Sequence, residues 1–214
     1  MATRNIDTLY NFYLYVCRKE RGIFVTTSKF TANLDAAQME VFEEYFKLYG
    51  VNQTIHDAIR PFRVYYQFTS DAAGFVTYPA DYLHIVGTAF TVTGSTMNEI
   101  TMPNEDEFVG AVNSQLRPVS NAEPVGRDTS TGFSIYPQST QIGFFTYLRR
   151  PATPVWGGTQ VGRVLTYNSG TSTQLEWSDS YINAVLATAF KFAGINMDEQ
   201  GISQFADQFE KETE

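Results

Sequence analysis

Residues 132–148 have the sequence GFSIYPQSTQIGFFTYL, in which two runs rich in aromatic and aliphatic residues flank a polar segment, Pro137–Thr140. Runs of this kind with a period of two are typical of strands, and proline followed by polar residues is typical of a turn. The stretch therefore predicts a hairpin of strands 132–136 and 141–148. Hairpins build antiparallel sheets, so this stretch also indicates the fold class.

The strand signature extends outward from this hairpin over about residues 62–177, where Thr, Val, Tyr and Phe are frequent and Gly and Pro punctuate them. A short helix is expected near 104–111, because acidic residues at 105–107 would interact favourably with the dipole of its first turn. The other strands that the pattern predicts are 63–68, 85–92, 99–101 and 164–168.

Helical periodicity precedes the β region. From Ile6 the apolar residues recur at helical spacing and form one stripe, which ends at Gly22. A second helix is predicted to start at Asp35, where Gln38 would complete a capping box, and to end at Gly50. A short third helix, 54–60, would stop at the following proline.

Helical periodicity returns after the β region. Ser178 is a suitable N-cap for a helix that Gly194 would close, and a last helix is expected over residues 196–209. The sequence therefore predicts an α+β fold with N-terminal helices, a central mainly antiparallel β region and a C-terminal helical pair. We expect a single domain, 1–214, with helical parts 1–62 and 178–214 and a β-rich part 63–177.

Composition and charge limit the classes of function that the chain can have. The 214 residues include 43% hydrophobic, 18% charged and 15% aromatic side chains, which suffices for a core and leaves apolar surface for protein partners. The net charge of -8 argues against nucleic acid as the main ligand, because phosphate binding needs clustered cations. The charge-free residues 129–148 are too polar for a membrane span, and Cys17, the single cysteine, excludes an intrachain disulfide.

The charge is uneven along the chain. Residues 1–29 carry five basic and two acidic side chains, a net charge of +3, whereas residues 171–214 carry eight acidic and two basic ones, a net charge of -6. We expect the basic first helix, with Arg18, Lys19 and Arg21, to lie against an acidic surface. The acidic end of the chain is one candidate supplier, through Asp207, Glu210, Glu212 and Glu214.

The sequence contains no recognisable catalytic or metal motif. His56 and His84 have no second ligand at metal-binding spacing, and Cys17 falls on the buried stripe of the first helix. Residues 157–164 superficially resemble a phosphate-binding loop, but Arg163 and Val164 stand where the lysine and the Ser or Thr are required. We therefore expect neither catalysis nor a metal, nucleotide or redox cofactor.

Aromatic and basic residues near the end of the β region are candidates for subunit contacts. Trp156, Tyr167 and Trp177 bracket a glycine-rich, charge-poor stretch that a monomer would cover poorly. For Trp177 a place in the core is the equal alternative. Arg149 and Arg150, at the end of a strand, would suit a carboxylate-rich partner surface.

Three segments carry a family resemblance. The turn Tyr78–His84 resembles an apolar-Pro-x-Asp-aromatic element of head-to-tail adaptor proteins in short-tailed phages. Residues 147–157, from Tyr147-Leu148-Arg149-Arg150-Pro151 to Pro154-Val155-Trp156-Gly157, resemble a segment of ring and connector proteins of crAss-like phages. Leu175-Glu176-Trp177, the helix end at Ala193-Gly194-Ile195 and the Phe205-Ala206 helix are similar to the C-terminal end of the same proteins.

The resemblance implies a non-catalytic virion protein, assembled in the host cytoplasm. It would form a ring of about twelve copies between the portal protein and adjacent tail ring proteins, with DNA passing unbound through the lumen. An acidic lumen would repel the duplex, and aromatic side chains would suit subunit contacts. The alternative is a monomeric β-rich binding module that presents Trp156 and Tyr167 to carbohydrate or peptide. An enzyme would need a clustered acid and base, which the sequence does not show.

Overall fold

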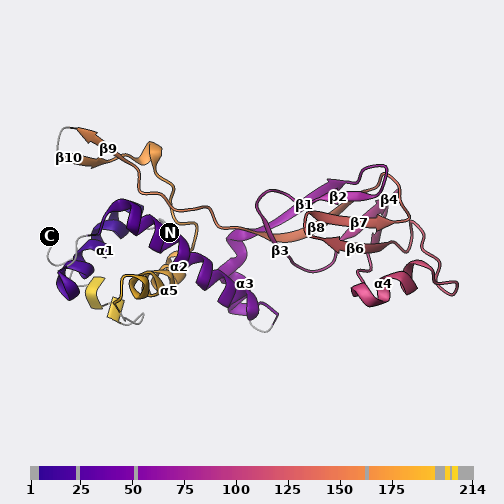
Figure 1. Cartoon of the computed structure of the whole chain (residues 1–214), viewed down its shortest axis with the longest axis horizontal. Coiled ribbons are helices and arrows are strands. Elements are labelled where there is room, and N and C mark those ends of the chain that lie inside the picture. Colours follow the sequence, from indigo (N-terminus) through magenta and orange to yellow (C-terminus); the bar gives the residue numbers. More distant parts are fainter. Residues whose placement is uncertain are drawn as a thin grey trace. The chain divides into compact units, whose positions relative to one another are not determined.

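Helices come from the two ends of the chain and strands mostly from its middle, so the fold is α+β, as predicted. The computed structural model describes residues 5–22, 25–50, 53–161, 164–195, 201–202 and 204–206. The chain divides into a helical unit, Met1–Pro61 with Pro151–Glu214, and a sheet unit, Phe62–Arg150 (Figure 1).

The sequence was expected to form a single domain with three parts; the chain forms two compact units, and residues 151–177 belong to the helical one. The β-rich part was predicted to continue to residue 177, but the chain after Pro151 packs against helices instead. The Gln38 side chain donates to the carbonyl of Ala152 (3.0 Å), and the backbone N–H of Ile6 donates to Gln174 Oε1 (2.7 Å). These bonds tie the returning segment to the helical unit.

The helical unit contains α1 (Ile6–Arg21), α2 (Thr27–Lys47), α3 (Gln53–Ile59) and α5 (Asp179–Phe192). The Asn5 side chain caps the start of α1, and Gly22, with a φ of 64°, supplies the left-handed residue at its end. Helix α2 begins well before the predicted Asp35, because the Thr26 side chain accepts from the N–H of Lys29.

Aromatic residues join these helices. The ring of Tyr13 on α1 stacks on Phe190 of α5, with a centroid distance of 4.7 Å and an interplanar angle of 7°. Its hydroxyl donates to the carbonyl of Ala189 (3.1 Å) and accepts from Asn33 of α2 (3.0 Å). One tyrosine therefore links three helices, with α5 packed along α2 (Figure 1).

The rest of the helical unit contains a short β-hairpin and short helical segments. Strands β9 (Gly158–Val161) and β10 (Val164–Tyr167) pair antiparallel, and a 3₁₀ turn, Ser169–Thr171, follows them. Strand β9 lies inside the range that superficially resembles a phosphate-binding loop. Within the predicted last helix, residues 201–202 and 204–206 are helical and Ile202 is buried, while 196–200, 203 and 207–214 lie outside the described residues.

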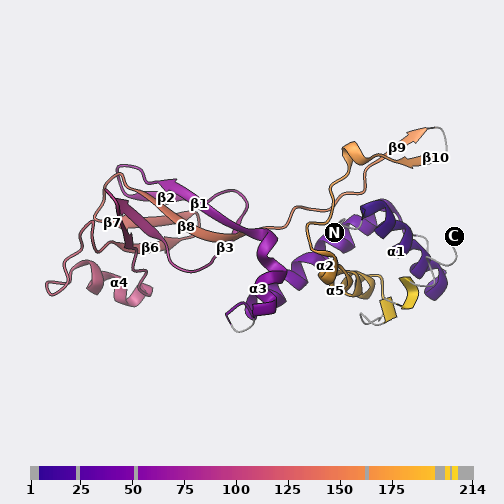
Figure 2. The same ribbon diagram turned by 180° about the vertical axis from the view of Figure 1, so that it is seen from behind.

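The sheet unit holds two antiparallel sheets and helix α4 (Glu105–Val112) (Figure 2). The five-stranded sheet has the order β1-β8-β4-β5, with β3 also paired to β8; its strands are Arg63–Thr69, Ile142–Arg149, Phe90–Thr93, Thr96–Glu99 and, for β3, Tyr82–Ile85. The three-stranded sheet has the order β2-β7-β6, with strands Phe75–Thr77, Gly132–Tyr136 and Val125–Thr129.

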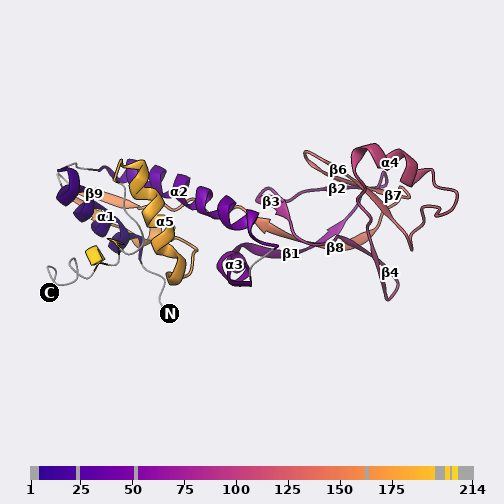
Figure 3. The same cartoon turned by 90° about the horizontal axis from the view of Figure 1, so that it is seen from below.

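The hairpin predicted for residues 132–148 is wrong. Strand β7 pairs with β2 and β6, whereas β8 pairs with β1, β3 and β4, so the two strands lie in different sheets (Figure 3). The connection is held where the Ser70 hydroxyl donates to the carbonyl of Ser139 (2.9 Å). A period of two specifies which side chains face a core but not which strand is the partner.

The core of the sheet unit lies between these two sheets. Phe133 of β7 packs edge-on against Phe145 of β8, with ring centroids 5.7 Å apart. Gly143 allows close packing here, because a Cβ at this position would collide with the Phe90 carbonyl and the Phe68 ring. The buried residues of this core are Phe68, Val76, Ala89, Ile100, Phe133, Ile135, Phe145 and Tyr147.

Candidate functional site

A cluster of tyrosines and carboxylates fixes the turn Tyr78–His84 in the sheet unit. The rings of Tyr78 and Tyr82 stack with centroids 3.8 Å apart and an interplanar angle of 1°. The Tyr78 hydroxyl donates to Asp128 Oδ1 (2.7 Å), and the N–H of Tyr82 donates to the Pro79 carbonyl (3.0 Å). The turn is therefore anchored through side chains as well as through its backbone.

The same turn contacts the end of β8. The Tyr147 hydroxyl donates to Asp81 Oδ1 (2.8 Å), and the N–H of Arg150 donates to the Asp81 carbonyl (2.8 Å). Tyr82 is also paired with Arg149 across β3 and β8. Two of the three segments that carry the family resemblance therefore lie against each other.

The phenols of this cluster are held neutral. Burial, together with the hydrogen bond to Asp128, raises the pKa of Tyr78. Burial and the hydrogen bond to Asp81 raise the pKa of Tyr147 to about 12, and burial raises the pKa of Tyr82. Neutral phenols donate hydrogen bonds and are poor bases, so the arrangement suits holding the turn in place.

Of the residues proposed for subunit contacts, Trp156 and Trp177 lie inside the helical unit, and for Trp177 this is the core position that was the equal alternative. Trp156 is 8% exposed, its Nε1 donates to Asp7 Oδ1 (2.9 Å), and its ring lies beside Tyr10. Trp177 is 0% exposed and packs edge-on against Tyr45 of α2. Helices α1 and α2 supply the cover that the glycine-rich sequence around these residues lacks.

The other candidate contact residues differ in exposure. Tyr167 is half-buried beside Trp156, with its hydroxyl accepting from Gln174 Nε2 (3.1 Å). Arg149 is half-buried with its guanidinium 5.7 Å from the centre of the Phe62 ring, whereas Arg150 is exposed. Contact between the two arginines and a carboxylate-rich partner stays a prediction.

An apolar surface of the sheet unit was not predicted from the sequence. The five-stranded sheet has apolar side chains on the face that points away from the core, which we name the outer sheet face: Tyr65, Phe90, Val92, Met97, Ile142 and Phe144. Tyr65 is 64% exposed, Met97 54% and Ile142 47%. Apolar surface of this kind marks protein interaction sites.

The outer sheet face is continuous across four strands. Phe90 lies directly opposite Phe144, and Val92 lies opposite both Ile142 and Met97. The Tyr65 ring stacks on Phe144 at 5.1 Å with an interplanar angle of 12°. A signal was present in the sequence, because residues 142–148 have apolar side chains on both faces of the strand instead of one.

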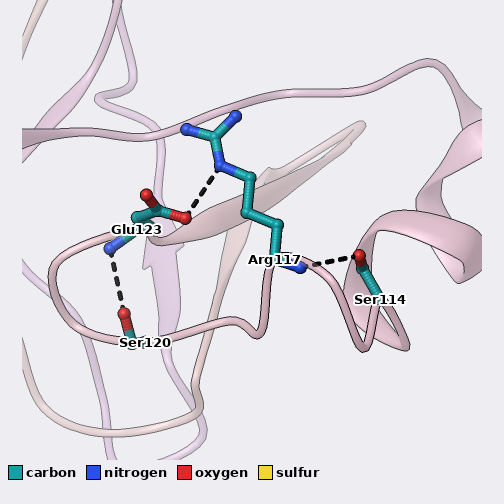
Figure 4. A network of polar contacts seen from close by, with 4 residues as sticks. All are labelled: Ser114, Arg117, Ser120 and Glu123. Atoms are coloured by element: carbon teal, nitrogen blue, oxygen red, sulfur yellow. Dashed lines mark hydrogen bonds and ion pairs between the residues drawn. The ribbon is translucent and has the colours of Figure 1, made fainter.

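The loop after α4 is ordered by its own polar contacts (Figure 4). Arg117 Nε lies 2.8 Å from Glu123 Oε2, and its backbone N–H donates to the Ser114 hydroxyl (3.1 Å). The N–H of Glu123 donates to the Ser120 hydroxyl (3.2 Å). Leu116 of this loop is fully exposed.

Each unit contains a recess. The first, about 140 Å³, is smaller than a typical ligand pocket and is lined by Thr101, Ala111, Ser114, Arg117, Glu123 and Val125. The second, about 360 Å³, lies in the helical unit and is open to solvent; its lining is Thr27, Ser28, Thr31, Ala32, Asp35, Thr153, Val155 and Trp156.

The candidate reactive residues are separate in the structure. His56 stacks on Tyr49 with ring centroids 3.9 Å apart, and His84 lies in β3. Cys17 is buried, which raises the pKa of its thiol to about 11. Among the described residues, no three His, Cys, Asp or Glu side chains come together in a group that could hold a metal ion.

The basic surface of α1 can be described only in part. Lys19 is exposed and its ammonium lies 4.6 Å from the centre of the Tyr15 ring, while the carbonyl of Arg18 accepts from the N–H of the C-cap residue Gly22 (2.9 Å). The acidic residues 207–214, expected as its partner, lie outside the described residues. Their pairing with α1 stays a prediction.

Neither a family model nor a curated protein matches this chain. Within the described part of the chain, every helix is too short or too polar to cross a membrane.

Proposed function

We propose that this chain is a structural protein of a bacteriophage virion. It forms an oligomeric ring in the head-to-tail connector of a short-tailed, crAss-like phage, between the portal protein and adjacent tail ring proteins. The virion tail is its location, and DNA passes through its lumen without specific binding. The chain performs no catalysis in this role.

The observation that carries the proposal is the contact between Tyr147 and Asp81. These residues belong to the two resembling segments of the sheet unit, and they are hydrogen-bonded at 2.8 Å although 66 positions separate them. The third resembling segment makes a similar contact in the helical unit, where Glu176 Oε2 accepts from the N–H of Ala152 (2.9 Å). Resembling segments that contact one another in the fold support the family resemblance better than isolated sequence matches do.

Surface properties agree with a ring component. The outer sheet face offers apolar surface for protein contacts, and the net charge of -8 suits a lumen through which phosphates slide. The alternative, a monomeric module for carbohydrate or peptide, relied on exposed aromatics at Trp156 and Tyr167. Trp156 is buried and its Nε1 already has a partner, so the ring is the function that the observations favour.

The mass of the purified protein in solution, alone and with a portal ring, tests the proposal. We expect a discrete ring of about twelve copies by mass photometry and by electron microscopy, because a heterologous interface that closes gives one defined size. Asp81→Ala should reduce ring formation by releasing the Tyr78–His84 turn, whereas Arg117→Ala in the exposed loop should not. A protein that stays monomeric even with the portal ring present would contradict the proposal.

A further inference from the structure

The two ends of the five-stranded sheet are open strands. Strand β1 pairs with β8 and β5 pairs with β4. In the part of the chain that the structure describes, β1 has no strand on its other side and β5 has none beside residues 96–99, although Thr101, just after β5, bridges Val125 at the start of β6. The residues of β1 alternate in exposure, with Arg63, Tyr65, Gln67 and Thr69 all exposed. An open edge strand is a template for pairing with another chain.

Two hydrogen bonds define which backbone groups of β1 point outward. The N–H of Ser70 donates to Gln141 (2.8 Å) in the register of β1 and β8, so even-numbered residues direct their backbone groups at β8. Thr146 lies opposite Tyr65, and its carbonyl accepts a hydrogen bond from the N–H of Val86 on the other side of β8 (2.8 Å). Tyr65 and its odd-numbered neighbours therefore present their N–H and C=O groups to solvent.

The same reasoning applies to β5. The N–H of Ile100 donates to the carbonyl of Ala89 (2.8 Å), continuing the register in which Glu99 lies opposite Phe90. Even-numbered residues of β5 therefore face β4. Met97 and Glu99 direct their backbone groups outward, and both side chains are exposed on the outer sheet face.

Strand direction permits a head-to-tail repeat. The path β1-β8-β4-β5 contains four antiparallel strands, so β5 runs opposite to β1. If β1 of a second copy pairs antiparallel with β5, this β1 runs in the same direction as β1 of the first copy. The two copies then have the same orientation and the same outer face, which is the relation between neighbours in a ring.

One register matches both the backbone groups and the side chains. With Met97 opposite Tyr65, Glu99 lies opposite Arg63, and all four residues have outward backbone groups and side chains on the outer face. The most exposed apolar residues of the two edges then meet, and an acidic residue faces a basic one. Shifting the register by two residues removes the opposite charges, because Glu99 would face Tyr65 or Pro61.

We propose that β5 of one copy pairs antiparallel with β1 of the next, in the register Met97–Tyr65 and Glu99–Arg63. The sheet then continues from copy to copy, and the occupant of each open edge is a second copy of this chain. The inference deepens the proposed function and rests on it, since it names the subunit contact of the ring. Cross-strand apolar and opposite-charge pairs would stabilise this contact.

A cysteine pair tests the register directly. Hydrogen-bonded cross-strand residues have Cα atoms about 5.5 Å apart, within the range of a disulfide. The full chain carrying both Tyr65→Cys and Met97→Cys should form a ladder of disulfide-linked oligomers on mild oxidation, because each copy holds both halves of the bond. The native Cys17 is 1% exposed and is not expected to react.

Matched controls separate this register from other contacts. Each single cysteine variant should remain unlinked, and Thr69→Cys with Met97→Cys should link poorly, because Thr69 is about 13 Å further along β1. Dimers formed by Tyr65→Cys alone would indicate two-fold pairing of β1 with itself. That result would overturn the proposal.

Charge reversal provides a second measurement. Arg63→Glu and Glu99→Arg should each lower the association constant about two- to five-fold at low salt, because like charges then face each other across the strands. The double variant should recover most of the loss, since the opposite charges are restored in exchanged positions. Equal and additive losses in the double variant would contradict this register.

The outcomes distinguish the inference from the proposed function. Closed rings in electron micrographs without the 65–97 disulfide would overturn the strand pairing and leave the ring function intact. A disulfide ladder without closed rings would support the pairing and contradict the ring. A monomer that neither assembles nor cross-links, alone or with the portal ring, would overturn both.

Discussion

The two units of this protein use aromatic side chains in different ways. In the helical unit Tyr13, Trp156 and Trp177 are buried, and among its described residues Phe192 is the most exposed aromatic side chain. In the sheet unit aromatic side chains lie on both faces of one sheet, with Phe145 in the core and Tyr65 on the outer face. The high aromatic content thus supplies a core in both units and, in the sheet unit, an exposed apolar face as well.

The largest effect that tests this comparison is loss of Trp177. We expect Trp177→Ala to lower the free energy of unfolding by about 3 to 5 kcal/mol, because a fully buried ring leaves a large cavity. Tyr65→Ala should change the stability of the monomer by under about 0.5 kcal/mol, since that ring is 64% exposed. Urea denaturation followed by far-ultraviolet circular dichroism measures both variants.

In an assembly assay the order of the two effects should be reversed. Tyr65→Ala should weaken ring formation at unchanged monomer stability, whereas Trp177→Ala should affect assembly only through unfolding. If Tyr65→Ala destabilised the monomer as much as Trp177→Ala, the contrast between the two units would be lost.

A smaller effect concerns alkaline pH. The pKa of Tyr147 in the sheet unit and of Tyr13 in the helical unit is raised to about 12, mainly by burial. Each raised pKa favours the neutral phenol in the folded state, so its contribution to stability is complete below pH 10 and falls between pH 10 and 12. Tyr147→Phe should therefore reduce the alkaline loss in the sheet unit, and Tyr13→Phe that in the helical unit.

Spectroscopy can separate these two losses. Both tryptophans, Trp156 and Trp177, belong to the helical unit, so tryptophan fluorescence reports that unit, while the near-ultraviolet dichroism of tyrosine also includes the sheet unit. Fluorescence-detected urea titrations between pH 9 and pH 11.5 should respond to Tyr13→Phe and not to Tyr147→Phe. An equal response to both would mean that the two units unfold as one.

The smallest expected effect is at Arg117. The side chains of Arg117 and Glu123 are 72% and 46% exposed, and exposed ion pairs contribute only about 0 to 1 kcal/mol. Arg117→Ala should shift the urea midpoint little, and the same shift should appear in Glu123→Gln and in the double variant. A loss above about 2 kcal/mol would show that this loop supports the core of the sheet unit.

Much of the secondary structure was predictable because local signals determine it. Gly22 and Ser178 mark helix ends in the sequence and lie at those positions in the structure. The predicted start of the second helix was wrong because the bond between Gln38 and Asp35 (2.9 Å) forms inside α2 instead of at its end. An Asp and a Gln three residues apart are neighbours in a helix interior as well as at a cap.

Sheet pairing and the candidate site were less predictable. Strands β7 and β8 have the alternation of a hairpin, yet each pairs with other strands, because alternation selects a face and not a partner. Trp156 was expected at a contact because its sequence neighbours are small, but its cover comes from α1, far away in the chain. The outer sheet face could have been inferred from Ile142 and Phe144, which are apolar at positions facing away from the core.

The way the chain enters and leaves the sheet unit has a consequence for the origin of the protein. Arg63, near the beginning of that unit, is paired with Leu148, near its end, so one short gap separates the entry and exit points. A gene segment that encodes such a unit can be inserted into a helical ancestor, or exchanged for another, while the flanking residues stay close enough to be rejoined. The helical unit would then be the older host, and lineages that carry different inserts in the same place would share its helices and differ in their subunit contacts.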